Sequence, residues 1–287
     1  MTERILLVDG MALLFRGFYA TSFTGNYMIT SNGTPTNGVF QFLRYFTNAI
    51  ETFEPTHVIC CWDMGSKTFR TEMYPAYKGN REAPPEELIP QFDLVKEVVE
   101  AYQVPNIGLV NYEADDCIGT FSRKFSNTHD VLILTGDHDM LQLVDYQISV
   151  AIMRKGIGNY EVYNQENFAE KMGVIPSQII DMKGLTGDSA DNYPGVKGIG
   201  EKTALKLLSE YETIDNLLEN VHLLTKGLQK KINENMDMLH LSRELAKIKC
   251  DVPIECTLEH AIWKYEKEKV NDFLTELEIR KAETFLI

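Results

Sequence analysis

The sequence predicts an α/β protein whose N-terminal half contains a mostly parallel sheet and whose C-terminal half is helical. Two observations support this prediction. In the first half, short apolar runs alternate with longer amphipathic stretches, as they do where helices connect the strands of a parallel sheet. After about Val162 the short apolar runs stop, and the remaining chain shows only helical periodicity.

Four short apolar runs are predicted as buried strands, because each is bounded by charged or turn-forming residues. They are Ile5–Val8, Val58–Trp62, Val131–Leu134 and Ile148–Met153. The amphipathic stretches between them cover about Gly38–Phe53, Glu86–Tyr102, Ala114–Phe125 and Met140–Val144. From roughly Gln165 to Ile287 we expect helices joined by short turns, packed against the first half without a linker.

The composition is that of a globular protein in a reducing compartment. The chain has 287 residues, 44% of them hydrophobic, which is enough for one large domain or two closely packed ones. No apolar run reaches the roughly 20 residues of a membrane helix, and the first residues do not form a signal peptide, so a cytoplasmic location is expected. The five cysteines form no C-x-x-C pair, which argues against a zinc site or a disulfide framework.

The formal net charge of −14 argues against nucleic acid as a partner, because binding to phosphates favours basic surfaces. That objection weakens if many acidic residues lie together and bind cations. The positions of the acidic residues therefore decide how the charge is interpreted.

Three predicted strands end in an aspartate, at Asp9, Asp63 and Asp137. Because ligands bind at the carboxyl ends of parallel strands, these three side chains should share one crevice. Other acidic residues lie near the strand ends, at the start of a predicted helix and after Gly187: Asp139, Glu113, Asp115, Asp116, Asp188 and Asp191. A helical turn would place Asp188 and Asp191 on one face.

A single aspartate before a helix is most often only a cap, so Asp9 or Asp115 alone would prove little. Acidic residues at three strand ends are harder to explain in this way, because several like charges beside a core repel one another. Divalent ions relieve that repulsion, and ligands that are all oxygen suit Mg²⁺ or Mn²⁺ better than Zn²⁺. Such clusters with two ions typically support phosphoryl displacement.

A basic and aromatic segment follows Asp63. Between Met64 and Arg81 there are four basic residues and one acidic residue, in a chain that is otherwise acidic. Basic side chains interleaved with aromatic rings are typical of contacts with a nucleic-acid single strand, although a solvated loop is the simpler interpretation. The segment contains Lys67, Phe69, Arg70, Tyr74, Tyr77, Lys78 and Arg81.

A second candidate is the glycine-rich turn from Gly195 to Gly200, which precedes an amphipathic stretch containing Lys202. It is neither a Walker loop nor a G-x-G-x-x-G motif. Its glycines would let backbone N–H groups approach a phosphate at a helix N-terminus, with Lys197 and Lys202 adding charge. Turns of this kind between helices also occur for purely structural reasons.

Several motifs of this sequence, in their order and spacing, closely resemble the bacterial and phage 5′→3′ exonuclease and flap endonuclease family, which includes the 5′ nuclease domain of bacterial DNA polymerase I. The matching segments are LLVDGMALLFRGFYA, PTNGVFQFLRYF, CWDMGSKTFRTEMYPAYKGNR, YEADDCIGT, LTGDHDMLQLV and KGLTGDSADNYPGVKGIGEKTALKLL. The resemblance extends from about Arg4 to at least Ile254, and the chain is expected to be the form without a polymerase.

The resemblance implies a PIN-like nuclease core at residues 1–172, with a helical arch at about 64–102, and a helical region at 173–287. The latter would contain a helix–hairpin–helix element, called H3TH, at about 176–211. It further implies a metal site of Asp9, Asp63, Glu113, Asp115, Asp116, Asp137, Asp139, Asp188 and Asp191, and active-site roles for Tyr77, Lys78, Arg81 and Lys183. The DNA contacts expected from these motifs are Lys67, Arg70, Gly195, Lys197, Gly198, Gly200 and Lys202.

The expected activity is hydrolysis of DNA near a free 5′ end, in replication and repair, with two Mg²⁺ ions that Mn²⁺ can replace. A K⁺ ion could bind the hairpin carbonyls. The expected partner is DNA with a 5′ flap, a 5′ overhang or a nick, bound by a monomer without a membrane. The alternatives are a non-catalytic scaffold for branched DNA, a PIN-type ribonuclease and, more weakly, a Mg²⁺ phosphatase, which the absence of a second aspartate after Asp9-Gly10 disfavours.

Overall fold

The computed structural model describes residues 3–23, 25 and 27–287. Its centre is a six-stranded sheet in the order β3-β2-β1-β4-β5-β6, in which only β6 runs antiparallel to its neighbour. The strands are β1 (Arg4–Asp9), β2 (His57–Cys61), β3 (Asn106–Ile107), β4 (Asp130–Thr135), β5 (Ile148–Met153) and β6 (Tyr160–Tyr163). The four strands predicted from apolar runs are confirmed, and the predicted α/β class with them.

The central strands are buried on both faces, which explains their continuous apolar sequences. In β1, Ile5 and Leu7 belong to the core on one face of the sheet, while Leu6 and Val8 belong to the core on the other. Edge strand β6 is half-buried and β3 has two residues, so neither has an apolar run of the predicted kind.

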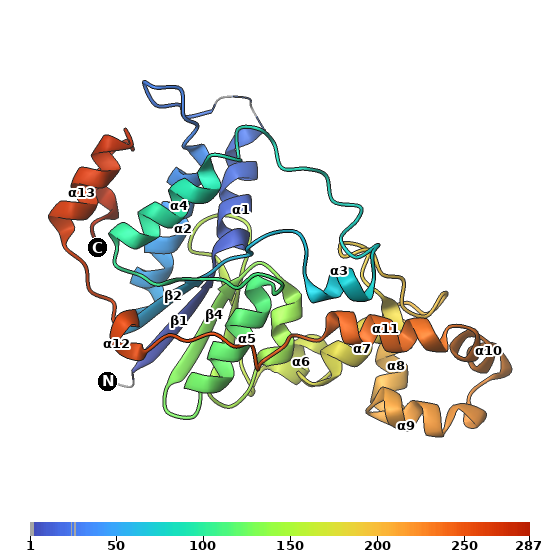
Figure 1. Ribbon diagram of the computed structural model, residues 1–287. Helices are drawn as coiled ribbons and strands as arrows, with labels where there is room; N and C mark the ends of the chain where they lie inside the picture. The colour runs from blue at the N-terminus through green and yellow to red at the C-terminus, as the bar shows by residue number, and fades with distance from the viewer. Residues whose placement is uncertain (1–2, 24, 26) are drawn as a thin grey trace.

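One face of the sheet is covered by helices from the N-terminal half (Figure 1). These are α1 (Gly10–Ser22), α2 (Asn37–Phe53) and α4 (Gln91–Ala101). Gly10 is required at the start of α1, because a Cβ atom there would lie about 2.5 Å from the Trp62 ring. The close approach lets α1 begin directly at the carboxyl end of β1, with Asp9 as its N-cap.

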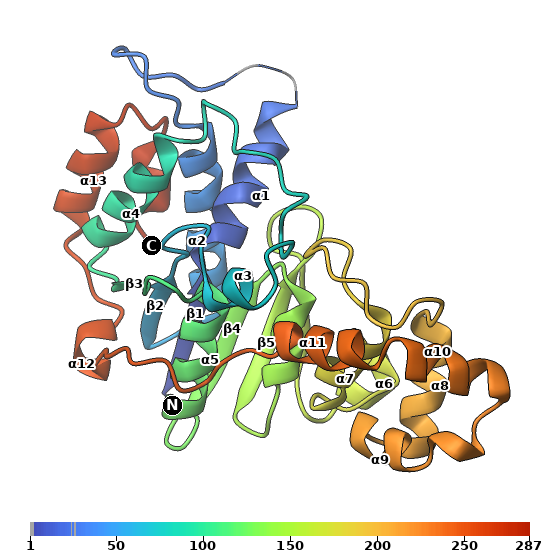
Figure 2. The same ribbon diagram turned by 45° about the vertical axis from the view of Figure 1, so that its right-hand side comes forward.

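The other face is covered by α5 (Ala114–Phe125) and by the helical region, whose apolar residues share one continuous core with the sheet. Figure 2 shows this region extending to the right of β4 and β5, away from the sheet. It contains α6 (Phe168–Met172), α7 (Gln178–Thr186), α8 (Glu201–Tyr211), α9 (Ile214–Glu219), η2 (Val221–Leu223), α10 (Lys226–Glu234) and α11 (Met236–Ala246). The helices of this region thus pack against the sheet through a shared core.

The last thirty residues return to the N-terminal half. They form α12 (Leu258–Ala261), α13 (Lys267–Glu276) and η3 (Ala282–Phe285), and α13 lies beside α4 in both views (Figures 1 and 2). Val270, Leu274 and Phe285 pack into the core of the α1–α2–α4 face, and the Tyr102 hydroxyl donates to the Phe285 carbonyl over 2.8 Å. The expected helical region of residues 173–287 is thus divided in space after α11.

Residues 64–102 do not form a continuous helical arch. This segment contains α3 (Phe69–Met73) and α4, which begins at Gln91 rather than at Glu86, and the residues between them form turns joined by irregular chain at 81–85. Pro75, Pro84, Pro85 and Pro90 explain the interruption, because proline lacks an N–H and disfavours helix in the preceding residue. The helix predicted at Met140–Val144 is a 3₁₀ helix, η1 (His138–Leu143).

The expected hairpin lies between α7 and α8, two helices that contact each other and are joined by residues 187–200. Among the described residues, no helix has the length and apolar character needed to cross a membrane.

Candidate active site

An open cleft of about 510 Å³ lies where β1, β2 and β4 end, as the positions of their aspartates predicted. Its acidic lining residues are Asp9, Asp63, Glu113, Asp115, Asp137 and Asp188. Three cations, Lys78, Arg81 and Lys183, line the same cleft. Side chains from the sheet, from the segment after α3 and from the helical region therefore meet at one place.

Asp9 is both a helix cap and a cleft residue. One carboxylate oxygen accepts a hydrogen bond from the Ala12 N–H over 2.9 Å, and the other accepts one from the Thr135 hydroxyl over 2.7 Å. Burial, assisted by the nearby charges of Asp63 and Asp137, raises the pKa of Asp9 to about 6. Asp9 thus caps α1, as the simpler interpretation predicted, and also lies in the cleft, as the functional interpretation predicted.

Three more carboxylates line the cleft near the start of α5, two from the N-cap and first turn of α5 and one from the residues after β2. Asp63, two residues beyond β2, accepts the Ala114 N–H over 2.7 Å and so fixes the first turn of α5 beside the sheet. Asp115 faces the cleft, and its burial, together with the charges of Asp137 and Asp9, raises its pKa well above the usual range. Glu113 is the N-cap of α5.

Glu113 is held by three donors from the segment 70–78. Its Oε1 atom lies 2.9 Å from Lys78 Nζ, and its Oε2 atom accepts from the Tyr77 hydroxyl over 3.2 Å and from Arg70 over 3.3 Å. Burial opposes the charge on Lys78, but Glu113 and Asp191 outweigh it and raise the pKa of this lysine. These two carboxylates therefore favour the charged form of Lys78.

The 3₁₀ helix after β4 carries the next pair. Asp137 caps this helix by accepting the Asp139 N–H over 2.8 Å. Asp139 Oδ1 lies 2.5 Å from Lys183 Nζ, a residue of α7. Burial and the charge of Asp137 nevertheless raise the pKa of Asp139 to about 7. This carboxylate is consequently unstable as an anion when no further cation is present.

Asp188 and Asp191 lie in a turn and not on a helical face, so the predicted local geometry is wrong. Helix α7 ends at Thr186, and a short antiparallel bridge between Asp188 and Tyr193 closes the turn. Gly187 has φ +72°, and a Cβ atom there would lie 2.3 Å from the Pro194 backbone, so only glycine permits the turn. Both carboxylates are still directed at the cleft cations.

Each carboxylate of this turn pairs with a different cation. Asp188 pairs with Lys183, and this pair outweighs the effect of burial and lowers the pKa of Asp188. Asp191 pairs with Arg81 over 2.7 Å and accepts the Tyr77 hydroxyl over 3.0 Å. The turn is thereby attached to the segment that carries Tyr77, Lys78 and Arg81.

Two asparagines complete this attachment and were not predicted. Asn80 donates to the Ser189 carbonyl over 2.9 Å, and Asn192 donates to the Ala76 carbonyl over 2.7 Å. The Lys78 N–H also donates to the Asp191 carbonyl over 2.9 Å. No sequence pattern marks these asparagines, because their partners lie about 110 residues away in the chain.

Two predicted site residues lie beneath the cleft instead of in it. Asp116 is fully buried, and both of its oxygens accept hydrogen bonds from protein donors, which leaves no free acceptor position for the predicted metal ion in this structure. Arg70 is buried against Asp116, with 2% of its surface exposed, so the predicted contact with DNA is also wrong. Counting charges along the sequence could not reveal this pairing, because the two residues are 46 positions apart.

The hairpin residues lie outside the cleft lining. Lys197, Gly198, Gly200 and Lys202 are exposed, and Gly200 is the N-cap of α8. Gly195 differs, because it is buried against Gly187 and its N–H donates to the Ser242 hydroxyl over 3.2 Å. The Gly195 N–H is therefore already used within the protein and is not free to bind a phosphate. Lys67 is exposed on the loop before α3.

The donor set fits hard divalent cations. In the described part of the chain, no three acidic, histidine or cysteine side chains are arranged as a ready-made ion site, and Lys78, Arg81 and Lys183 pair with several of the carboxylates. Burial and mutual repulsion raise the pKa values of Asp9, Asp115 and Asp139. A bound cation would reduce this repulsion and favour the ionised carboxylates. The ligands would all be oxygen atoms.

Comparison with known proteins gives the family. The N-terminal, resolvase-like domain of 5′–3′ exonucleases matches residues 4–173, and their C-terminal SAM-fold domain matches residues 174–269. A 5′–3′ exonuclease of Bacillus subtilis is 56% identical, over 99% of this chain and 96% of its own. A DNA polymerase I of Lactococcus lactis is 41% identical over 96% of this chain, but the match covers 32% of the polymerase.

Solved structures show the same fold. A flap endonuclease of bacteriophage T5, in a complex with DNA and metal ions, has a TM-score of 0.69 and 20% identity over 99% of this chain and 97% of its own. The family domains together cover most of the chain, and the bacterial relative covers nearly all of it. The chain therefore belongs to the 5′–3′ exonuclease family.

Proposed function

We propose that this protein hydrolyses DNA phosphodiester bonds at or near free 5′ ends, as an exonuclease and as a flap endonuclease, in a reaction that depends on Mg²⁺. One observation carries the proposal. Carboxylates from three strand ends, from α5 and from the helical region border the same cleft as the cations Lys78, Arg81 and Lys183. Such a cleft provides ligands for cations and positive charge for a phosphate.

The carboxylates form two groups that suit two divalent ions. The first, on β1, β2 and α5, is Asp9, Asp63, Glu113 and Asp115. The second, on the η1 segment and the turn after α7, is Asp137, Asp139, Asp188 and Asp191. Bound Mg²⁺, or Mn²⁺ in its place, would supply Lewis acidity and lower the pKa of water. Asp116 is left out of this assignment because its oxygens are already occupied.

The protein's own cations would act on the scissile phosphate. Lys78 and Arg81 pair with Glu113 and Asp191 in the structure, and ions on these carboxylates would release both side chains toward the DNA. A fixed positive charge beside developing negative charge lowers the barrier most in a water-poor cleft. Tyr77 remains protonated, since burial and Glu113 raise its pKa, and it would orient Glu113.

Duplex DNA would be bound by the hairpin and not by the acidic cleft. Gly198 and Gly200 are exposed next to the N-terminus of α8, where free N–H groups favour a phosphate, and Lys197 and Lys202 add positive charge. Lys67 would contact DNA from the loop before α3. The K⁺ ion that the resemblance implies would compete with Lys231, whose ammonium group donates to the Gly198 carbonyl over 2.8 Å.

The cellular setting is part of the same proposal. The enzyme would act as a monomer in the cytoplasm, on 5′ flaps, 5′ overhangs and nicks that arise in replication and repair. Residues 1–172 would provide the nuclease core, and residues 173 to the end of α11 would provide the duplex-binding hairpin.

Cleavage of a 5′-labelled flap substrate with mapped products tests the function. With Mg²⁺ we expect cuts near the junction between flap and duplex, together with short products from recessed 5′ ends, and no products with EDTA. The Asp115→Asn variant should be inactive while still binding the flap. Cleavage of a matched RNA flap in preference to DNA would favour a ribonuclease, and binding without cleavage under every divalent ion would favour a scaffold.

A further inference from the structure

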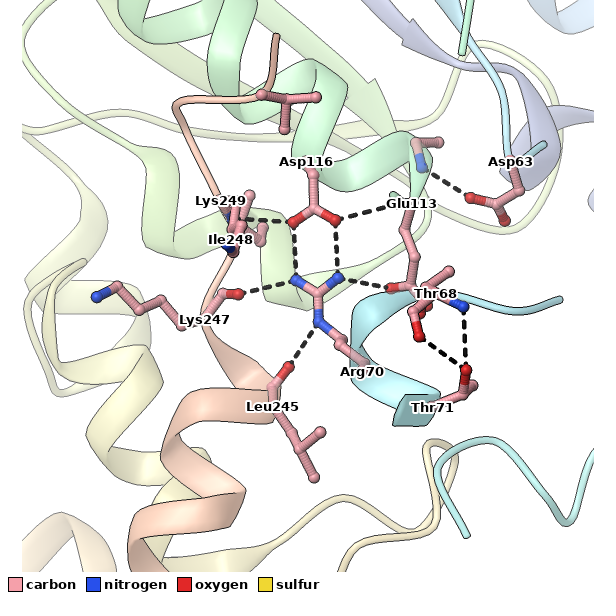
Figure 3. Close-up of polar contacts among 12 residues, drawn as sticks. Asp63, Thr68, Arg70, Thr71, Glu113, Asp116, Leu245, Lys247, Ile248 and Lys249 are labelled. Carbon is pink, nitrogen blue, oxygen red and sulfur yellow. Dashed lines mark hydrogen bonds and ion pairs between the residues drawn. The ribbon is translucent and has the colours of Figure 1, made fainter. Parts of the chain in front are cut away.

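Arg70 lies at a buried junction of three chain segments, where it contacts Glu113 of the cleft lining (Figure 3). All five of its N–H groups have acceptors. Two bond to the Asp116 carboxylate over 2.8 Å each, and one bonds to Glu113 Oε2 over 3.3 Å. The remaining two donate to the Leu245 and Lys247 carbonyls, at the end of α11, over 2.9 and 2.8 Å. The guanidinium thus joins α3, α5 and α11.

Asp116 completes the junction and has no free acceptor position. Each of its oxygens accepts one Arg70 N–H and one backbone N–H, from Lys249 over 2.9 Å and from Glu113 over 3.1 Å. Four donors use the whole acceptor capacity of a carboxylate. This acid therefore acts on the cleft only through its neighbours.

Glu113 is the residue through which the junction reaches the cleft. Its backbone N–H is fixed by Asp116, and its Oε2 atom is fixed by Arg70 and by the Tyr77 hydroxyl. Its Oε1 atom, on the other side of the carboxylate, bonds to Lys78 at the cleft. Both the main chain and one carboxylate oxygen of Glu113 are thus set by groups that line neither the cleft nor the hairpin.

We propose that Arg70 is a positioning residue, which through Asp116 and directly holds Glu113 in the orientation that a divalent ion requires. The proposal rests on the proposed function, because it assigns Glu113 to the metal site. Partners that orient a metal ligand commonly change metal affinity or activity by about 10- to 100-fold when they are removed. Lysine cannot replace Arg70, since it has three donors without the planar fork that reaches all five acceptors.

The competing explanation is that the junction only stabilises the fold. A buried ion pair is weak evidence for that explanation, because its desolvation offsets much of its attraction, although removing one partner alone is strongly destabilising. The two roles predict different measurements. A purely structural role changes the melting temperature and leaves metal affinity per folded molecule unchanged, whereas a positioning role changes metal affinity in the folded protein.

The test compares Arg70→Gln and Arg70→Lys with the parent protein. Mn²⁺ binding is titrated without DNA by electron paramagnetic resonance, and the Mg²⁺ dependence of single-turnover cleavage is measured at saturating flap DNA. We expect both variants to bind the tighter Mn²⁺ ion at least about tenfold more weakly, and to need correspondingly more Mg²⁺ for half-maximal cleavage. Flap affinity in EDTA should stay within about threefold, since Arg70 is buried.

Arg243 provides a matched control. It also bridges two acids, Asp181 over 2.6 Å and Asp215 over 3.0 Å, but in the helical region outside the cleft. Arg243→Gln and Arg243→Lys should lower the melting temperature in EDTA without changing Mn²⁺ affinity. Because loss of the guanidinium can prevent folding, Asp116→Asn is measured as well, since asparagine keeps the size of the side chain and one acceptor oxygen for Arg70. It should weaken Mn²⁺ binding in the same way.

Normal Mn²⁺ affinity in any folded Arg70 variant, with a loss confined to stability, would overturn the proposal. So would weaker flap binding with an unchanged metal titration, which would make Arg70 a DNA contact. The failure of the proposed function looks different. In that case the parent itself does not cleave DNA, while its Mn²⁺ titration without DNA still reports whether Arg70 positions Glu113.

Discussion

At the scale of single residues, the cleft contains more carboxylates than its cations neutralise. Lys78, Arg81 and Lys183 each pair with acids. Burial nevertheless raises the pKa of Asp9, which has no cationic partner among the described residues, and it outweighs the pair with Lys183 in raising the pKa of Asp139. An anion held in this way lowers stability and is ready to bind a metal. The excess of buried negative charge that destabilises the metal-free site therefore also favours the binding of cations.

This imbalance predicts a pH dependence of stability in EDTA. The pKa of Asp139 is about 7 in the folded protein against 3.8 for a free side chain, so folding favours its protonated form. The ionised Asp139 side chain therefore lowers the free energy of unfolding. This loss of stability is fully present above pH 7 and disappears as the pH falls toward 4. Asp139→Asn should therefore raise the melting temperature at pH 8, and by less at pH 5.5.

Differential scanning fluorimetry in EDTA at both pH values measures this effect. The exposed Asp272 on α13 serves as the control, and Asp272→Asn should give the same small change at pH 8 and pH 5.5. If Asp139→Asn raised the melting temperature equally at the two pH values, the ionised form of Asp139 would not be what destabilises the folded protein.

Lys78 and Lys67 belong to one basic segment but should act differently. Lys78 lines the cleft, whereas Lys67 is exposed outside it. Lys78→Ala should lower single-turnover cleavage by on the order of 10²-fold or more, as for loss of a group that stabilises transition-state charge, with little change in duplex affinity. Lys67→Ala should instead weaken binding of flap DNA and leave the rate at saturation nearly unchanged. Equal losses of binding and rate in Lys78→Ala would make it an affinity contact.

At the scale of elements, the hairpin before α8 depends on a backbone conformation that favours glycine. Gly198 has φ +82°, and a Cβ atom there would lie 3.1 Å from Lys231 Nζ. Gly198→Val should therefore distort the hairpin and weaken duplex binding, while Mn²⁺ binding stays intact. Gly227→Val, on α10 where a Cβ atom meets open space, is the matched control and should bind DNA normally. Normal flap affinity in Gly198→Val would contradict the hairpin assignment.

Elements defined by periodic sequence could be predicted, and elements defined by tertiary contacts could not. The four apolar strands and the positions of Asp9, Asp63 and Asp137 at their ends follow from local sequence. The turn at Asp188 depends on Gly187 packing against Pro194, and two acids spaced three apart look the same in a turn as in a helix. Similarly, the Arg70–Asp116 pair exists only because α3 and α5 meet. The roles of these two residues were predicted from their charges, and their burial against each other could not be predicted.

At the scale of the whole molecule, the site exists because the helical region packs against the carboxyl ends of the strands. One apolar core runs from β1 and β4 into α7, α8 and α11, and it places Lys183 and Asp188 opposite Asp139. The attachment of residues 76–81 to residues 188–192 adds a second constraint. Metal binding in the cleft should thus be sensitive to changes far from it in sequence.

The central claim is that both halves of the chain build one two-ion site. The most direct measurement is single-turnover flap cleavage by the double variant Asp188→Asn with Asp191→Asn, alongside its melting temperature and its flap affinity in EDTA. The double variant Asp237→Asn with Asp272→Asn, which removes the same charge from exposed helix positions on α11 and α13, is the control.

We predict that the Asp188 and Asp191 variant stays folded, although less stable, because the lowered pKa of Asp188 shows that its charge is favourable next to Lys183. Its flap affinity should match that of the control. Its cleavage with Mg²⁺ should fall by more than the roughly 100-fold that loss of an outer-shell partner causes. Cleavage close to the parent rate would contradict the account, and would place the whole metal site in the N-terminal half.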